Sequence, residues 1–137
     1  ALRIVSETGS RLPIYCTSQG KVFLANMSRA GAEALLRAQP MTQFTPHTVT
    51  DPSALMREIE TCRANGYAIE NGEYKIGLRS ISAPVYTVEG KARYTVGVIG
   101  MFRSTRSDEF LAAGEQGCAA ASMISTALGY RKTEKLL

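Results

Sequence analysis

The chain has 137 residues, of which 45% are hydrophobic and 20% charged, with a formal net charge of +4. This composition is typical of a folded globular protein and excludes intrinsic disorder, and the length predicts one domain over residues 1–137. No apolar run is long enough to cross a membrane, and residues 1–5 lack the features of a secretory signal peptide.

The cysteines indicate the redox compartment of the protein, and the distribution of charge bears on nucleic-acid binding. The three cysteines are widely spaced and odd in number: Cys16, Cys62 and Cys118. This pattern disfavours a disulfide framework and favours a reducing compartment, so we expect a cytoplasmic protein. The basic residues are scattered along the sequence, which is typical of a solvated surface rather than of a nucleic-acid-binding face.

The first third of the chain predicts a short strand at residues 2–5 and two helices. The first helix begins near Ser18 and continues to Met27. Ser28 is a suitable N-cap for the second helix, which Pro40 ends.

A third helix and a strand follow a loop at residues 40–50. Asp51 and Pro52 are typical of the N-cap and first position of a helix, and Gly66 is suited to the left-handed position that ends it. The helical spacing between these limits is carried by three residues, Leu55, Ile59 and Cys62. Residues 67–69 then form a strand that enters a turn at 70–73.

The stretch 74–102 predicts a β-hairpin. It is rich in β-branched and aromatic residues, alternates in polarity, and is interrupted by a two-residue turn at Glu89-Gly90. In the resulting register, one face carries Arg79, Ile81, Ala83 and Val85 opposite Gly100, Val98, Val96 and Tyr94. The other face carries Leu78, Ser80, Ser82 and Pro84 opposite Met101, Ile99, Gly97 and Thr95.

The two hairpin faces have different expected roles. The first is apolar and predicts a packing surface for helices. The second mixes apolar, small and hydroxylated side chains, which suits either the floor of a small-molecule pocket or an ordinary half-solvated sheet. Thr105 or Ser107 caps a last helix that extends to about Gly129, and its small residues predict close packing on the apolar face. The predicted fold class is α+β with a mainly antiparallel sheet.

The sequence offers little catalytic or metal-binding chemistry. His47 has no other metal ligand near it, so we expect no metal and no cofactor. Residues 18–21 end like a phosphate-binding loop but lack the required earlier glycine and the final Ser or Thr. A solvated turn accounts for Glu73, whereas the role of Glu70 is left open.

The segment 15–20 is the strongest candidate for binding. It passes directly from an extended segment into a helix, whose free N–H groups attract a carboxylate or another acceptor. The alternative is that Thr17 or Ser18 only caps the helix. Cys16 lies in the same segment, and a thiolate is favoured near a helix N-terminus, so a thiol enzyme using Cys16 is a second functional hypothesis.

Three segments together resemble the C-terminal effector-binding domain of the IclR family of bacterial transcription regulators. They are residues 9–25 (GSRLPIYCTSQGKVFLA), 66–70 (GYAIE) and 77–85 (GLRSISAPV), followed by VGVIG at 96–100. The resemblance implies a GAF-like fold with a curved antiparallel sheet flanked by helices. It also implies a non-enzymatic sensor whose ligand modulates DNA binding by an N-terminal winged helix-turn-helix domain outside this sequence.

The resemblance also implies site residues and partners. It implies an effector site at Ser18, Gln19, Glu70, Leu78, Ser80, Gly97 and Ile99. To these the helix start adds Cys16 and Thr17, and the apolar lining of the same face adds Met101, which completes the expected site. Expected partners are a small-molecule effector and DNA, the latter only through the missing domain, and the expected assembly is a homodimer or homotetramer, with no membrane contact.

Two positions depart from relatives that bind small 2-oxo acids, because Gly97 and Ile99 stand where those relatives have serines. We therefore expect a larger and more apolar effector, with aromatic compounds among the candidates, and we expect Gly97 to leave space beside Ser82.

Overall fold

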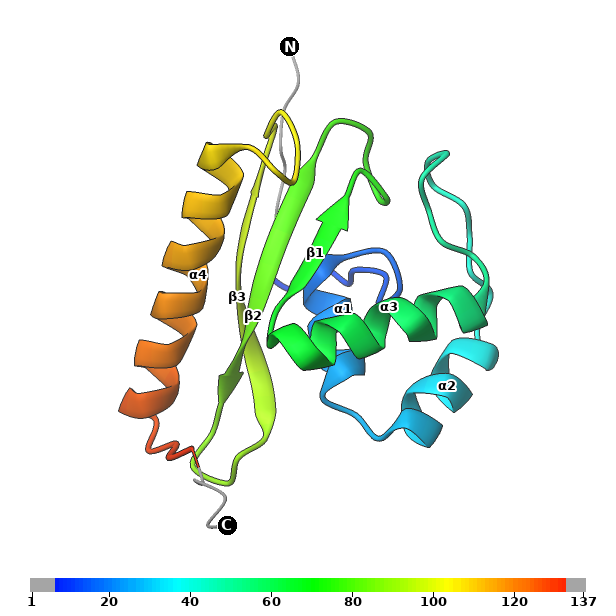
Figure 1. The fold of residues 1–137 in the computed structure, drawn as a ribbon. Coiled ribbons are helices and arrows are strands. Elements are labelled where there is room, and N and C mark those ends of the chain that lie inside the picture. Colours follow the sequence, from blue (N-terminus) through cyan, green and yellow to red (C-terminus); the bar gives the residue numbers. More distant parts are fainter. Residues whose placement is uncertain (1–6, 133–137) are drawn as a thin grey trace.

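In the computed structural model, which describes residues 7–132, a three-stranded antiparallel sheet lies between one helix on one side and three helices on the other (Figure 1). The strand expected at residues 2–5 lies outside this range. In chain order the elements are α1 (Ser18–Ala25), α2 (Arg29–Arg37), α3 (Pro52–Asn65), β1 (Ala68–Asn71), β2 (Arg79–Tyr86), β3 (Ala92–Gly100) and α4 (Asp108–Ala127). The strand order is β1-β2-β3, and the α+β class is confirmed.

Each helix begins at a residue whose side chain accepts a backbone N–H, which satisfies donors that the first turn leaves free. The four N-caps are Thr17, Ser28, Asp51 and Ser107. Gly66 ends α3 with a φ of 80°, a left-handed conformation that glycine adopts without steric cost. These boundaries confirm the predicted starts of the helices and select Ser107 over Thr105.

The predicted register of the hairpin is confirmed. Ser80 lies opposite Ile99, and Ser82 lies opposite Gly97. The connection differs, because a bulge between Val85 and Tyr86 shifts the pairing so that Tyr86 lies opposite Ala92. The strands are therefore joined by a five-residue loop, 87–91, rather than by a two-residue turn.

Helix α4 covers one face of the sheet, as Figure 1 shows. Its small residues allow this approach: a Cβ added at Gly114 would lie 2.8 Å from Ile81 Cδ1, and one at Gly117 would lie 3.6 Å from Val98 Cγ2. The alternation of β2 therefore points Ile81 toward α4, as predicted.

The opposite face is covered by α1, with α3 and α2 packed outside it. Their shared core contains Val22, Leu24, Leu36, Leu55 and Ile59. The start of α1 packs very closely on the preceding chain, since a Cβ at Gly20 would lie 2.1 Å from the carbonyl oxygen of Ile14. This contact fixes the first turn of α1 against the segment that precedes it. Within residues 7–132, no helix combines the length and hydrophobicity needed to span a bilayer.

Candidate functional site

The first turn of α1 separates a capping residue from a residue that faces the sheet. Thr17 Oγ1 accepts the N–H of Gly20 at 3.2 Å and donates to the carbonyl oxygen of Pro13 at 2.6 Å. The Thr17 hydroxyl therefore both donates and accepts a hydrogen bond within residues 13–20. Ser18 is not the cap, and its side chain is free to contact β2.

Three serine hydroxyls and one carboxylate meet between α1 and the sheet, and we call these four residues the hydroxyl cluster. Ser18 Oγ lies 2.7 Å from Ser82 Oγ and 2.8 Å from Ser80 Oγ. Ser80 Oγ also lies 3.2 Å from Glu70 Oε2. All four residues are buried, with at most 4% of their surface exposed. The structure thus brings together Ser18, Ser80 and Glu70, which the sequence predicted as site residues, and adds Ser82.

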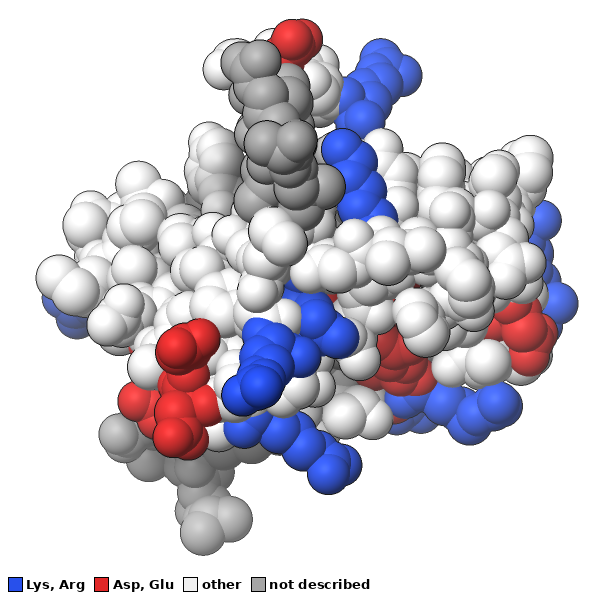
Figure 2. Space-filling model, turned by 90° about the horizontal axis from the view of Figure 1, so that it is seen from above, with Lys and Arg blue, Asp and Glu red and all other residues white. Residues whose placement is uncertain are grey.

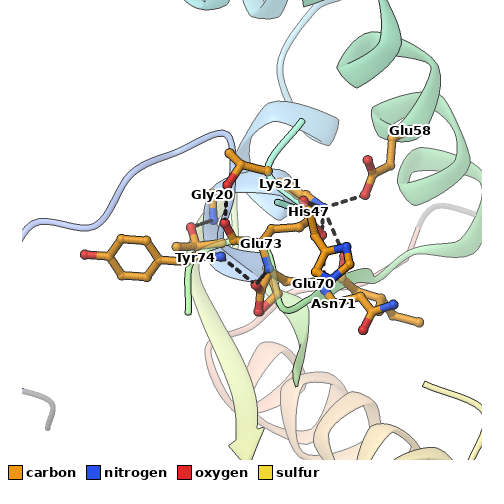
Figure 3. A network of polar contacts seen from close by, with 12 residues as sticks. Gly20, Lys21, His47, Glu58, Glu70, Asn71, Glu73 and Tyr74 are labelled. Atoms are coloured by element: carbon orange, nitrogen blue, oxygen red, sulfur yellow. Dashed lines mark hydrogen bonds and ion pairs between the residues drawn. The ribbon is translucent and has the colours of Figure 1, made fainter. Parts of the chain in front are cut away.

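Glu70 also holds the turn between β1 and β2. Its Oε1 atom accepts the backbone N–H groups of Glu73 and Tyr74, as Figure 3 shows. A carboxylate that accepts several N–H bonds is held in a fixed orientation. Its second oxygen is consequently directed at Ser80.

A fully buried lysine lies beside this turn. The ammonium of Lys21 donates to Glu73 Oε1 at 2.8 Å, to Glu73 Oε2 at 2.9 Å and to the carbonyl oxygen of Ile69 at 3.2 Å, and it also binds Glu58. Burial lowers the pKa of Lys21, but Glu73 and Glu58 outweigh this effect and leave the pKa above its ordinary value. Lys21 is therefore held as a cation.

The solvated-turn interpretation of Glu73 is wrong. Glu73 is 6% exposed, and its carboxylate is bound by Lys21 and by the N–H of Asn71. Burial raises the pKa of Glu73 despite these partners. The sequence signal for a buried carboxylate was Lys21, which lies three residues after Ser18 and one before Val22, on the buried side of α1. A lysine there requires a carboxylate partner.

The loop at residues 40–50 closes over the same turn. Thr45 donates to the carbonyl oxygen of Gly72 at 2.7 Å, and Thr48 donates to that of Glu73 at 2.6 Å. His47 lies next to this network but is exposed. Among residues 7–132, no group of three or more His, Cys, Asp or Glu side chains is arranged to hold a metal ion.

The remaining predicted residues lie at the margin of the hydroxyl cluster. Gln19 is half-buried, with its Oε1 atom 3.4 Å from Ser18 Oγ, and Leu78 is buried just before β2. On β3 and just after it, Ile99 and Met101 are 50% and 66% exposed. Because Ile99 pairs with Ser80, the exposed side of β3 borders the cluster directly. We call Gly97, Ile99 and Met101 the open face.

Gly97 does not leave empty space beside Ser82, so that expectation is wrong. A Cβ at Gly97 would lie 2.6 Å from Ser82 Oγ. The volume that a side chain would need is occupied by the serine hydroxyl, which is turned toward Ser18.

Cys16 is unsuited to nucleophilic chemistry. It is fully buried, and burial, with added repulsion from Glu73 and Glu70, raises its pKa to about 12. A thiol rather than a thiolate is therefore present at neutral pH.

We expect Cys16 to resist iodoacetamide at pH 7.5 in the folded protein, whereas the partly exposed Cys118 reacts first. Peptide mapping of the alkylated chain over time measures both rates. Alkylation of Cys16 before Cys118 would contradict its placement.

Two grooves lie on the α4 side of the sheet, away from the hydroxyl cluster. One, of about 370 Å³, is lined by residues that include Tyr86, Ser122 and Tyr130. The other, of about 510 Å³, lies between β1 and α4 and includes Ile69, Ile81 and Phe110. Neither groove contains a residue predicted for the site.

Comparison with known proteins gives consistent matches. The family model described as "Bacterial transcriptional regulator IclR C-terminal" matches residues 1–126. The chain is 29% identical over 130 residues to the HTH-type transcriptional repressor AllR of Escherichia coli K12, which covers 95% of this chain and 48% of AllR. The chain therefore spans about half the length of the curated relatives it matches.

Solved structures agree with the sequence matches. Thermotoga maritima IclR is 30% identical with a TM-score of 0.83, over 95% of this chain and 53% of that chain. The Agobacterium tumefaciens repressor BlcR is 32% identical with a TM-score of 0.81, over 93% of this chain and 51% of that chain. The family and these relatives are transcriptional regulators, not enzymes.

Proposed function

Because the chain belongs to the IclR family of bacterial transcriptional regulators, we propose that residues 1–137 form the effector-binding domain of such a regulator. A small organic molecule binds at the hydroxyl cluster and shifts the population of conformations or assemblies. That shift changes DNA binding by a winged helix-turn-helix domain elsewhere in the full-length protein.

One observation carries this proposal: the buried hydroxyl cluster borders the open face of β3. Buried polar groups fix the orientation of a small ligand, and exposed apolar groups beside them bury its surface. Here Ser80 and Glu70 supply the polar groups, while Ile99 and Met101 supply apolar contact. This combination favours an effector with one polar end and an apolar body.

The distribution of surface charge supports contact with DNA through another domain. Figure 2 shows Lys and Arg side chains in separate small groups, with acidic and uncharged surface between them. Tight binding to the DNA backbone requires many basic groups on one surface. We further propose that the regulator is a cytoplasmic homodimer or homotetramer, since symmetric assemblies bind two-fold DNA sites.

The site is tested by adding a charge to the open face. Ile99→Glu should abolish the ligand-induced rise in Tm, because the new carboxylate occupies the apolar side of the site. Tyr94→Glu is the matched control, since Tyr94 is 61% exposed on the same strand but faces the opposite side of the sheet. Each variant should change the unfolding free energy by only about 1 kcal/mol or less, because both side chains are exposed.

The measurement is a thermal-shift screen of the three proteins against aromatic and aliphatic metabolites. Equal ligand responses in Ile99→Glu and the wild type would place the site elsewhere. A panel in which no compound raises the Tm of the wild-type chain would count against effector binding by this domain.

A further inference from the structure

The two grooves on the α4 side of the sheet adjoin each other. We call the one of about 370 Å³ the tyrosine groove and the one of about 510 Å³ the isoleucine groove. Both are lined by Gly66, at the end of α3, and by Cys118, near the middle of α4. From Leu111 in the isoleucine groove to Thr126 in the tyrosine groove, α4 rises by about 22 Å. The two grooves therefore form one elongated hollow along this side of α4.

The isoleucine groove is mainly apolar. Its lining includes Ile69, Ile81, Phe110 and Leu111, and its one charged side chain is that of Glu115. Ile81 and Phe110 are buried at its floor, whereas Leu111 is 52% exposed at its rim. An alkyl chain that covers this surface removes apolar area from water, which is favourable.

The tyrosine groove carries the polar groups of the hollow. Its lining includes the hydroxyls of Ser122, Thr126 and Tyr130 and the ammonium of Lys132. Hydroxyl donors and an ammonium are suited to a carboxylate. The carbonyl oxygens of residues 124–126, which would repel an anion at the end of a helix, already accept the backbone N–H groups of residues 128–130.

The sheet beside the tyrosine groove is unsuited to an added peptide strand. β1 pairs with β2 only as far as Ser82, so residues 83–86 have no strand on that side in the described part of the chain. Pro84 has no backbone N–H, and the N–H of Tyr86 donates to Ser125 Oγ at 2.9 Å. A strand placed there would lack the donors of a β-ladder, which favours a ligand without a peptide backbone.

We propose that the joined grooves bind a long-chain carboxylate. Its carboxylate lies beside Lys132 in the tyrosine groove, and its alkyl chain extends through the isoleucine groove along Ile81 and Leu111. The length of the hollow, its apolar end and its cationic end together select this class of ligand. The site lies on the opposite face of the sheet from the hydroxyl cluster and is independent of the effector site.

Titration calorimetry of the 137-residue chain with hexanoate, octanoate and dodecanoate tests the site at pH 7, below the concentrations at which micelles form. Each methylene that is buried strengthens binding, so dodecanoate should bind at least about tenfold more tightly than hexanoate, equivalent to about 1.4 kcal/mol. Leu111→Glu should weaken dodecanoate binding on the order of tenfold, because it places a charge beside the alkyl chain. Lys132→Glu should weaken octanoate by a similar factor and leave the binding of 1-octanol unchanged.

Met123→Glu is the matched control, because Met123 is 73% exposed on the same helix and lines neither groove. It should bind dodecanoate like the wild type. All three replaced side chains are exposed, so the Tm of each variant should stay close to that of the wild type.

Four results would overturn the site. One is the absence of dodecanoate binding, and a second is equal weakening in Met123→Glu and Leu111→Glu. A third is binding that survives Leu111→Glu but is lost in Ile99→Glu, which would place the carboxylate at the open face. The fourth is a change in sedimentation of Leu111→Glu without any dodecanoate binding to the wild type, which would make the hollow a protein interface. None of these results removes the proposed effector-binding function, which the thermal-shift screen tests separately.

Discussion

Replacing Lys21 with methionine is expected to lower the free energy of unfolding by about 3–5 kcal/mol. The Lys21 ammonium is fully buried and contacts both carboxylate oxygens of Glu73, which is itself nearly buried. Without it, the nearly buried carboxylate of Glu73 loses the cation that both of its oxygens contact. Urea unfolding followed by circular dichroism measures the loss.

Two further variants identify the cause. Lys21→Met combined with Glu73→Gln should be less destabilised than the sum of the single variants, because no uncompensated charge remains. Arg29→Met removes a surface ion pair with Glu60, in which Arg29 is 75% exposed, and should cost no more than about 1 kcal/mol. Similar losses of unfolding free energy in Lys21→Met and Arg29→Met would show that the buried ion pair contributes no more to stability than the surface pair.

Gly20→Ala is expected to destabilise the protein by about 3 kcal/mol, at the upper end of the usual cost of overpacking. The added Cβ would lie 2.1 Å from the backbone oxygen of Ile14, which cannot rotate away as a flexible side chain would. The first turn of α1 must therefore move, and Ser18 moves with it. The variant should consequently lose ligand binding as well as stability.

Gly117→Ala is the matched control, because Gly117 also lies within a helix that packs on the sheet. Its added Cβ would lie 3.6 Å from Val98 Cγ2, an ordinary contact distance. Alanine in a helix is favoured over glycine by about 0.5–1 kcal/mol, so this variant should be as stable as the wild type or slightly more stable. Thermal melts of both proteins give the comparison, and equal destabilisation by the two alanines would contradict the close approach at Gly20.

Much of the fold could be predicted from local sequence because it depends on interactions between near neighbours. Asp51 and Pro52 start α3, and Gly66 ends it, through backbone groups only a few residues away. The facing of Ser80 and Ile81 to opposite sides of the sheet follows from strand alternation once the hairpin is recognised. The register accordingly predicts Ser80 on the mixed face of the hairpin, and the helix start makes Ser18 a candidate for binding, whereas Glu70 enters the predicted site only through the family resemblance.

The charge state and occupancy of the site were decided by tertiary structure alone. Lys21 is separated by 37 residues from Glu58 and by 52 from Glu73, and Ser18 by 64 from Ser82. Local propensity carries no information about such pairs, because they meet only when α1 packs across the sheet. For this reason the sequence predicts a solvated turn at Glu73 and open space beside Gly97. In the folded protein, Glu73 is buried against Lys21, and the hydroxyl of Ser82 fills the space beside Gly97.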